Sequence, residues 1–90
     1  MDIEFDQDKR DITLQERGLD FADAAAVFAG PGATTEDRRQ DYGEPRYITF
    51  GILNTRLVAL VWTPRGGKRR IISMRYANDR EKRKYQRTLG

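Results

Sequence analysis

The residues of this chain best suited to chemistry are arginines, lysines and tyrosines that gather in its last quarter. The run Arg70-Ile71-Ile72-Ser73-Met74-Arg75 leads into a basic stretch that also contains Glu81 and Tyr85. A guanidinium group binds a phosphate through two parallel hydrogen bonds and always carries its charge. It can stabilise the negative charge that develops when a phosphodiester is attacked. These residue types therefore predict a surface for phosphate binding or phosphoryl chemistry on RNA.

Charge is distributed unevenly along the chain. Residues 64–90 carry ten Lys or Arg and two acids, a net charge of +8, whereas residues 1–44 carry twelve acids and five bases, a net charge of −7. The overall charge of +3 hides this polarity. A focused basic surface is typical of proteins that bind nucleic acids.

The absence of His and Cys excludes several kinds of chemistry. The chain lacks the commonest general base near neutral pH and the usual ligands of structural zinc, so we expect no metal site and no cofactor. Acid–base steps would fall to Lys, Arg, Tyr, Asp or Glu, and a Lys among many cations loses its proton more easily. The RNA 2′-hydroxyl would then be the nucleophile, with Tyr as a proton donor or a stacking partner for a base.

Length and hydropathy set the organisation. Ninety residues predict a single domain, 1–90. No apolar run reaches the roughly 18 residues of a membrane span, and the N-terminus lacks the pattern of a signal peptide. We therefore expect a cytoplasmic protein without a membrane partner.

Helix signals dominate the first third of the chain. Asp6 is a predicted N-cap for a helix over residues 7–17, and Gly18 is its predicted left-handed stop. A second helix is expected over residues 21–29, with one apolar stripe. The members of that stripe are Phe21, Ala24, Ala25 and Phe28.

After the helical segments, the spacing of the apolar residues changes to the alternation that is typical of β-strands. We expect a meander over residues 46–53, 57–63 and 68–76, with residues 3–5 and 33–39 as further short strands or as irregular segments. Asn78 and Glu81 form a predicted capping box for a last helix over residues 78–89. Helices and strands that are grouped rather than alternating predict an α+β fold: two N-terminal helices on an antiparallel meander of three or four strands, with a C-terminal helix.

Strand alternation predicts which side chains share a face. If Ile72 and Met74 face the helices, then Ser73 and Arg75 lie on the open face together with Ile71. Arg46 begins the first meander strand and Arg65 lies in the turn beside the third.

The chain resembles the BrnT toxins of bacterial type II toxin–antitoxin systems. The resemblance is carried, in order over about 80 residues, by the following pieces: Phe5-Asp6-x-x-Lys9, Gly18-Leu19-x-Phe21-x-x-Ala24, Val27-Phe28, Glu44-x-Arg46, Gly51, Thr63-Pro64-Arg65, Arg70-Ile71-Ile72-Ser73-Met74-Arg75-x-Ala77 and Glu81-x-x-x-Tyr85. The chain departs from the family at Glu16-Arg17-Gly18, where Lys-His-Gly is common.

This resemblance implies a RelE-like ribonuclease fold and a metal-independent endoribonuclease that arrests translation. It also implies a BrnA-like antitoxin with a ribbon-helix-helix part that binds operator DNA. The functional candidates that it implies are Lys9, Arg46, Arg65, Arg70, Arg75, Glu81 and Tyr85. The basic stripe of the last helix is expected to contact RNA or the antitoxin, and consists of Arg80, Arg83, Lys84 and Arg87.

A plainer interpretation uses the same residues. Arg75 could simply pair with a carboxylate of the acidic first half, and Lys9 could be an exposed helix lysine. The chain would then be a non-catalytic module that binds RNA or acts only as the corepressor of the antitoxin. Salt-dependent binding without cleavage is what this alternative predicts.

Overall fold

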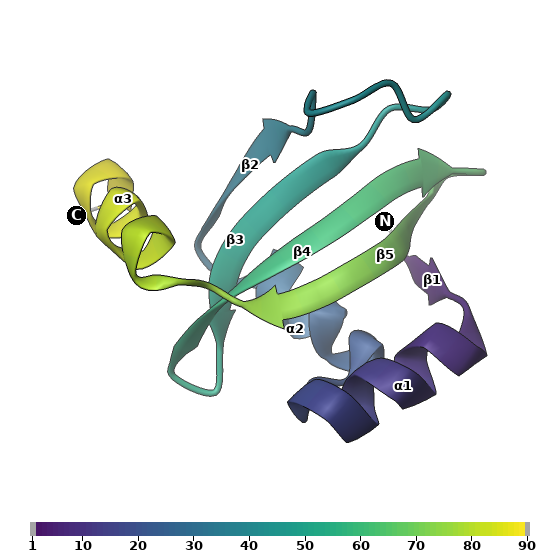
Figure 1. The fold of residues 1–90 in the computed structure, drawn as a ribbon, viewed down its shortest axis with the longest axis horizontal. Coiled ribbons are helices and arrows are strands. Elements are labelled where there is room, and N and C mark those ends of the chain that lie inside the picture. The colour runs from purple at the N-terminus through teal and green to yellow at the C-terminus, as the bar shows by residue number, and fades with distance from the viewer. Residues whose placement is uncertain (1, 90) are drawn as a thin grey trace.

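The structure, a computed structural model, describes residues 2–89, and at residues 88 and 89 it describes the backbone alone. Within that range the chain has an α+β fold with three α-helices, one short 3-10 helix and a five-stranded mixed sheet (Figure 1). The elements are β1 (Ile3–Phe5), α1 (Gln7–Arg17), η1 (Phe21–Asp23), α2 (Ala24–Ala29), β2 (Gly32–Glu36), β3 (Tyr47–Leu53), β4 (Arg56–Arg65), β5 (Lys68–Tyr76) and α3 (Asp79–Leu89).

The sheet has the strand order β1-β5-β4-β3-β2. The predicted meander is confirmed, since β3, β4 and β5 pair antiparallel in sequence. The expectation of three or four antiparallel strands was too narrow, because β2 pairs with β3 and β1 adds a parallel strand beside β5. Residues 3–5 form a strand because Ile3 and Phe5 pack on the core while the backbone of β1 pairs with β5.

The caps that end the helices are those that the sequence predicts. The Asp6 side chain accepts a hydrogen bond from the backbone N–H of Lys9, and Gly18 adopts a left-handed φ of 69°. Asn78 and Glu81 form the reciprocal capping box, with each backbone N–H donating to the other side chain at 2.9 and 2.8 Å. The starts of α1 and α3 and the end of α1 are thus fixed by local side-chain chemistry.

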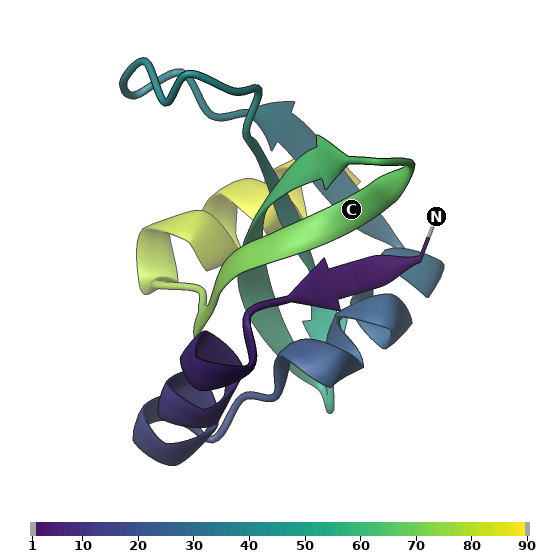
Figure 2. The same cartoon turned by 90° about the vertical axis from the view of Figure 1, so that its right-hand side faces the viewer.

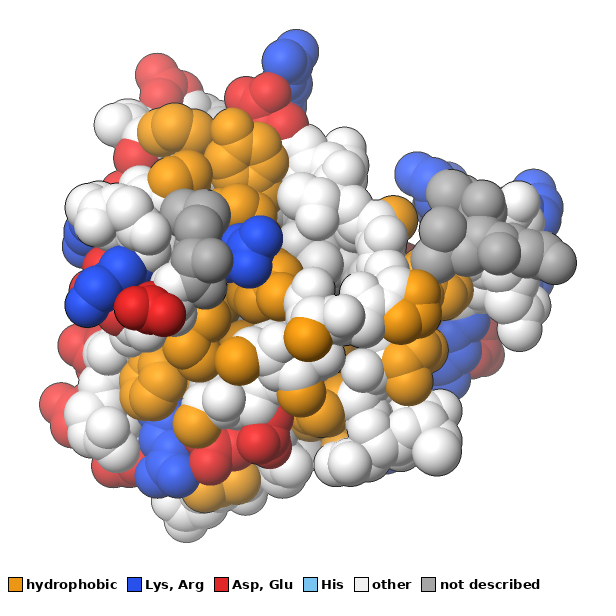
Figure 3. Space-filling view, turned by 180° about the vertical axis from the view of Figure 1, so that it is seen from behind, with side chains coloured by type: hydrophobic (Ala, Val, Ile, Leu, Met, Phe, Trp, Pro, Cys, Tyr) orange, Lys and Arg blue, Asp and Glu red, His pale blue; other side chains and the backbone are white. Residues whose placement is uncertain are grey.

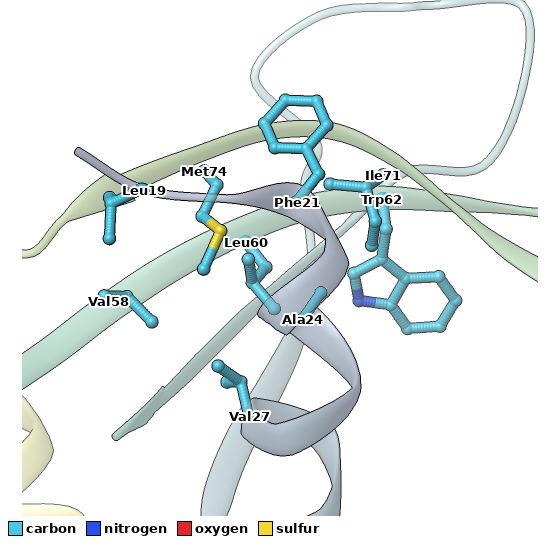
Figure 4. Packing of buried hydrophobic residues seen from close by; sticks show 9 residues of the cluster. All are labelled: Leu19, Phe21, Ala24, Val27, Val58, Leu60, Trp62, Ile71 and Met74. Carbon is cyan, nitrogen blue, oxygen red and sulfur yellow. The ribbon is translucent and has the colours of Figure 1, made fainter. Parts of the chain in front are cut away.

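The helices α1, η1 and α2 cover one face of the sheet, and the main core lies beneath them (Figure 2). Phe21, Ala24 and Val27 of η1 and α2 belong to the same buried cluster as Leu60 and Met74 of the sheet (Figure 4). Arg10 of α1 also pairs with Asp20 at 2.7 Å, which ties α1 to the start of η1.

The predicted stripe of the second helix needs a correction. Ala25 is exposed and Phe28 is only partly buried, whereas Phe21, Ala24 and Val27 are fully buried. The reason is that the segment opens with a 3-10 turn, so that residues three apart, rather than three and four apart, face the sheet.

A register shift between β4 and β5 changes the side-chain alternation of β5. Ser73 pairs with Val61, but Ile71 pairs with Trp62, so the intervening Ile72 has no partner in the register. This arrangement is a β-bulge, which turns the side chains on either side of it by one step.

The bulge overturns one prediction about the faces. Ile71 is buried in the core on the helix side, and not on the open face with Arg75 as strict alternation predicted. Arg69 consequently points to the helix side, with its guanidinium 4.1 Å from the centre of the Phe28 ring. The alternation that restarts at Ile71 places Arg70 on the same face as Arg75.

The last helix lies apart from the other two. It follows β5 and stands against the opposite face, near β2 and β3 (Figures 1 and 2). Of the three α-helices, only α1 and α2 therefore cover the same face. We call the face away from α1 and α2 the open face of the sheet.

Gly51 allows α2 to lie close to β3. A Cβ atom at Gly51 would stand 2.6 Å from Val27 Cγ1 and 3.4 Å from the Val27 carbonyl oxygen. We expect Gly51→Ala to reduce the free energy of unfolding by about 1–3 kcal/mol in chemical denaturation, because the branched Val27 side chain has little freedom to move away.

Gly30→Ala is the matched control. A Cβ atom at Gly30 has no neighbour closer than 3.8 Å, and its φ of −94° suits any residue. Val27→Ala should cost less stability in the Gly51→Ala background than in the wild type. Equal stability of the two glycine variants would show that Gly51 is not needed for this contact.

Candidate functional site

Five arginines of the open face and of the loops beside it are paired with carboxylates. The pairs are Arg75 with Glu81, Arg39 with Asp37, Arg46 and Arg65 with Glu44, and Arg70 with Glu4. Two of these pairs, Arg70–Glu4 and Arg65–Glu44, join the basic last quarter to the acidic first half. The sequence polarity is therefore partly neutralised within the folded chain.

Arg75 and Glu81 form a bidentate pair at the junction of β5 and α3. Arg75 Nη1 and Nη2 donate to the two Glu81 oxygens at 2.7 and 2.8 Å. These hydrogen bonds hold the pKa of Glu81 below its usual value and raise the pKa of Arg75. Because Glu81 also caps α3 through Asn78, one carboxylate joins the helix start to the arginine of the strand.

The prediction that Arg75 pairs with a carboxylate is confirmed, but the predicted partner is wrong. Arg75 pairs with Glu81 of its own segment and not with an acid of the first half. Its side chain remains 37% exposed, so solvent and ligands can reach the guanidinium.

The loop after β2 supplies a second arginine that is held in the same way. Asp37 is buried, and it accepts from Arg39 Nε at 2.8 Å and from Arg39 Nη2 at 2.7 Å. The Tyr42 hydroxyl donates to the same carboxylate at 3.1 Å. The Arg39 hydrogen bonds are the main cause that lowers the Asp37 pKa to about 2, so this carboxylate stays ionised at neutral pH.

The same network reaches Arg46, and the charge of Arg39 acts on Arg75 and Glu81. The Arg46 guanidinium lies 4.0 Å from the centre of the Tyr42 ring, and the Arg46 carbonyl accepts from the Asp37 N–H at 2.7 Å. Among the smaller effects, the charge of Arg39 lowers the pKa of Glu81 and acts against the raised pKa of Arg75. Arg39, Arg75 and Glu81 therefore belong to one electrostatic environment.

Arg39, Asp37 and Tyr42 were not among the residues predicted from the sequence. Residues 33–45 carry no strong hydrophobic period, so nothing in them predicts that Asp37 becomes buried. The available signal was local, since an Asp two residues before an Arg in a turn can bind both its backbone N–H and its side chain.

A groove of about 610 Å³ lies between α3 and strands β2 and β3. Arg80, Glu81, Lys84 and Tyr85 line it from the helix, and Phe50 lines it from the sheet. The Tyr85 hydroxyl donates to the Pro31 carbonyl at 3.2 Å, which ties the helix to the start of β2. The other two members of the predicted helix stripe are exposed outside this lining: Arg83 and Arg87.

The structure does not bring every predicted residue to this place. Lys9 is exposed on α1, which packs on the helix-covered side of the sheet, as the plain interpretation expected. Arg17, at the position of the family His, donates to the Met74 carbonyl at 2.9 Å on that same side. The residues that do come together on the open face are Arg39, Arg75, Glu81 and Tyr85, with Arg46, Arg65 and Arg70 further along.

Among residues 2–89 no group of three or more acids is arranged to hold a metal ion. None of the described helices has the length and apolar character needed to cross a membrane.

Comparison with known proteins places the chain in a family context. A family model described as "Ribonuclease toxin, BrnT, of type II toxin-antitoxin system" matches residues 5–81. The matched segment includes Arg39, Arg46, Arg75 and Glu81 and ends before Tyr85. No curated protein matches the chain.

The Asp37–Arg39 pair gives a prediction on acid stability. Because the Asp37 pKa falls from 3.8 to about 2 on folding, its stabilising effect is complete above about pH 4 and is lost as the pH falls through 2. We expect Asp37→Asn to be less stable at pH 7 by about 1–3 kcal/mol and to lose less stability between pH 4 and pH 2.

Urea denaturation followed at a series of pH values measures this difference. Glu36→Gln is the matched control, because Glu36 makes a neighbouring but exposed pair with Arg38. Parallel pH profiles for wild type and Asp37→Asn would contradict the prediction.

Proposed function

We propose that this chain, which belongs to the BrnT family of ribonuclease toxins of type II toxin–antitoxin systems, is a metal-independent endoribonuclease that cleaves RNA on the open face of its sheet. The observation that carries the proposal is the bidentate pair of Arg75 and Glu81 at the junction of β5 and α3, with a second bidentate pair, Arg39 and Asp37, in the loop after β2. An RNA phosphate bound to these arginines would receive positive charge without a metal ion.

Arg75 is the proposed first ligand of the scissile phosphate. Its fork has the bidentate geometry that a phosphate also fits, and Glu81 occupies that fork in the free protein. A bound phosphate would compete with Glu81 for the guanidinium. Binding of substrate would then weaken the hydrogen bonds that depress the Glu81 pKa, and the released carboxylate would become a better proton acceptor.

The proposed reaction is an in-line transfer within the RNA strand. Glu81 accepts the proton of the 2′-hydroxyl, the O2′–P bond forms, and the P–O5′ bond breaks. The leaving O5′ takes a proton, for which Tyr85 is the proposed O–H donor after its hydroxyl exchanges the Pro31 carbonyl for the substrate. Arg75 and Arg39 stabilise the pentacoordinate oxyanion, and Arg46, Arg65 and Arg70 hold flanking phosphates.

The finer biological context is also part of the proposal. We infer a RelE-like fold from the α+β architecture with its meander sheet, and we infer arrest of translation in the cytoplasm from the activity of a ribonuclease toxin. The expected neutralising partner is a BrnA-like ribbon-helix-helix antitoxin. Its acidic segments would be attracted to α3, where Arg83 and Arg87 are exposed.

A second candidate function is supported by one observation. Both Arg75 and Arg39 donate two hydrogen bonds to a carboxylate in the free protein, and the chain contains no His. Such a surface would suit a non-catalytic module that binds RNA or acts as a corepressor with the antitoxin. Only the endoribonuclease would cleave RNA repeatedly, so a measurement of RNA turnover distinguishes the two functions.

The deciding experiment uses purified protein, RNA and a chelator. We expect cleavage of RNA that persists in excess EDTA, and growth arrest with RNA decay when the chain is expressed without its antitoxin. Intact RNA in both assays, together with salt-dependent binding, would favour the non-catalytic module instead.

Arg75→Ala tests the proposed phosphate ligand. We expect the cleavage rate to fall by about 10²–10³, because one donor to the developing oxyanion is lost, while circular dichroism shows a folded chain. Arg56→Ala is the control, since this arginine lies outside the proposed site and stacks on Tyr76 with its guanidinium 3.6 Å from the ring centre. Undiminished toxicity of Arg75→Ala would remove Arg75 from the site.

A further inference from the structure

The groove beneath α3 has an aromatic residue on its floor. Phe50 lies on β3, is partly buried and lines the groove of about 610 Å³. The cross-strand partners of Phe50 are Ala33 on β2 and Ala59 on β4. Because both neighbours have only a methyl side chain, the sheet leaves space beside the Phe50 ring.

The same cross-strand row ends at Arg75. Ala59 pairs with Phe50 on one side and with Arg75 on the other. Phe50 and Arg75 are therefore two strand spacings apart, about 10 Å between backbones, and their side chains rise from the same face. An aromatic ring thus lies on the same face and in the same cross-strand row as the guanidinium that is proposed to hold a phosphate.

Helix α3 forms the wall of the groove opposite the sheet and supplies its basic side chains. Tyr85 lines the groove and is anchored by its hydroxyl to the Pro31 carbonyl. Arg80 and Lys84 also border it. Figure 3, a view from behind, shows Lys and Arg side chains on the projecting region at α3.

We propose that this groove is a binding site for one nucleobase of single-stranded RNA, which stacks on Phe50 while its phosphate binds Arg75. The inference rests on the proposed function and names the place of the nucleotide beside the scissile phosphate. An aromatic floor inside a basic rim is the combination by which proteins hold single strands, through base stacking and backbone charge. The charge of the rim favours a polyanion over an apolar or basic occupant. The base preference of such a slot is weak, because every base offers a face for stacking.

The test uses an RNA that the protein cannot cleave. A short 2′-O-methyl oligoribonucleotide with one 2-aminopurine lacks the nucleophile, and its fluorescence falls when the base stacks. We expect Phe50→Leu to weaken binding by at least about fivefold and to abolish the quenching, whereas Phe50→Tyr keeps the ring and stays close to wild type. Ile52→Ala is the matched control, because Ile52 is exposed on the same strand and face but outside the groove lining. Circular dichroism and thermal unfolding verify that all three variants are folded.

Each other outcome overturns a distinct claim. Unchanged binding and quenching in Phe50→Leu, with ordinary RNA still cleaved by wild type, would overturn the base site and leave the proposed function standing. Binding that depends on Phe50 without any cleavage by wild type would support the base site and contradict the enzyme. Weaker binding of purified antitoxin by Phe50→Leu, with oligonucleotide binding unchanged, would show that the groove docks protein and would overturn the inference.

Discussion

Burial of β4 on both faces is the constraint on which the rest of this structure depends. All residues from 57 to 63 are buried, as expected of a central strand. On one face α1, η1 and α2 provide the cover. On the other face Ala59 is fully buried although neither α1 nor α2 reaches it. That cover must come from long side chains of neighbouring strands, from the loop after β2 and from α3. Arginines suit this task because their stems pack on apolar surface while their charged ends reach solvent.

The charged side chains Arg39 and Arg75 of the open face and its loops form ion pairs with carboxylates. Asp37 stays ionised because Arg39 lowers its pKa to about 2, and Glu81 is held in the same way by Arg75. Two charged groups that are both hydrogen-bonded can lie partly buried at much lower cost than one alone. In the proposed function, a phosphate that binds Arg75 would displace the Glu81 carboxylate, and its affinity would depend on the difference between the two contacts. This exchange would make the Arg75 guanidinium available to substrate without leaving it unpaired in the free protein.

The sequence predicted those parts of the fold that depend on local chemistry. The caps at Asp6 and Gly18, the Asn78–Glu81 box and the meander all follow from short-range rules, and all are confirmed. The bulge at Ile72 was beyond such rules, because it depends on the register between two strands. That single residue changed the faces of Ile71 and of the arginines around it. The burial of Asp37 was missed for a similar reason, since it arises from the path of a loop over the sheet.

Within residues 2–89, the fold pairs some of the basic residues of the last quarter with acids and leaves others without an acidic partner. Its acidic half supplies partners for Arg65 and Arg70, which lowers the net charge around the sheet. Among the described interactions of α3, however, Lys82 pairs with Asp79, while none pairs Arg83 or Arg87 with an acid. Unpaired charge attracts a partner over a distance, whereas paired charge acts after contact by exchange of partners. The helix is thus suited to attract a polyanion or an acidic antitoxin, and the sheet is suited to hold one phosphate in a defined place. Under the proposed function, a chain without imidazole divides substrate capture and chemistry in this way, because both tasks then rest on the placement of arginines.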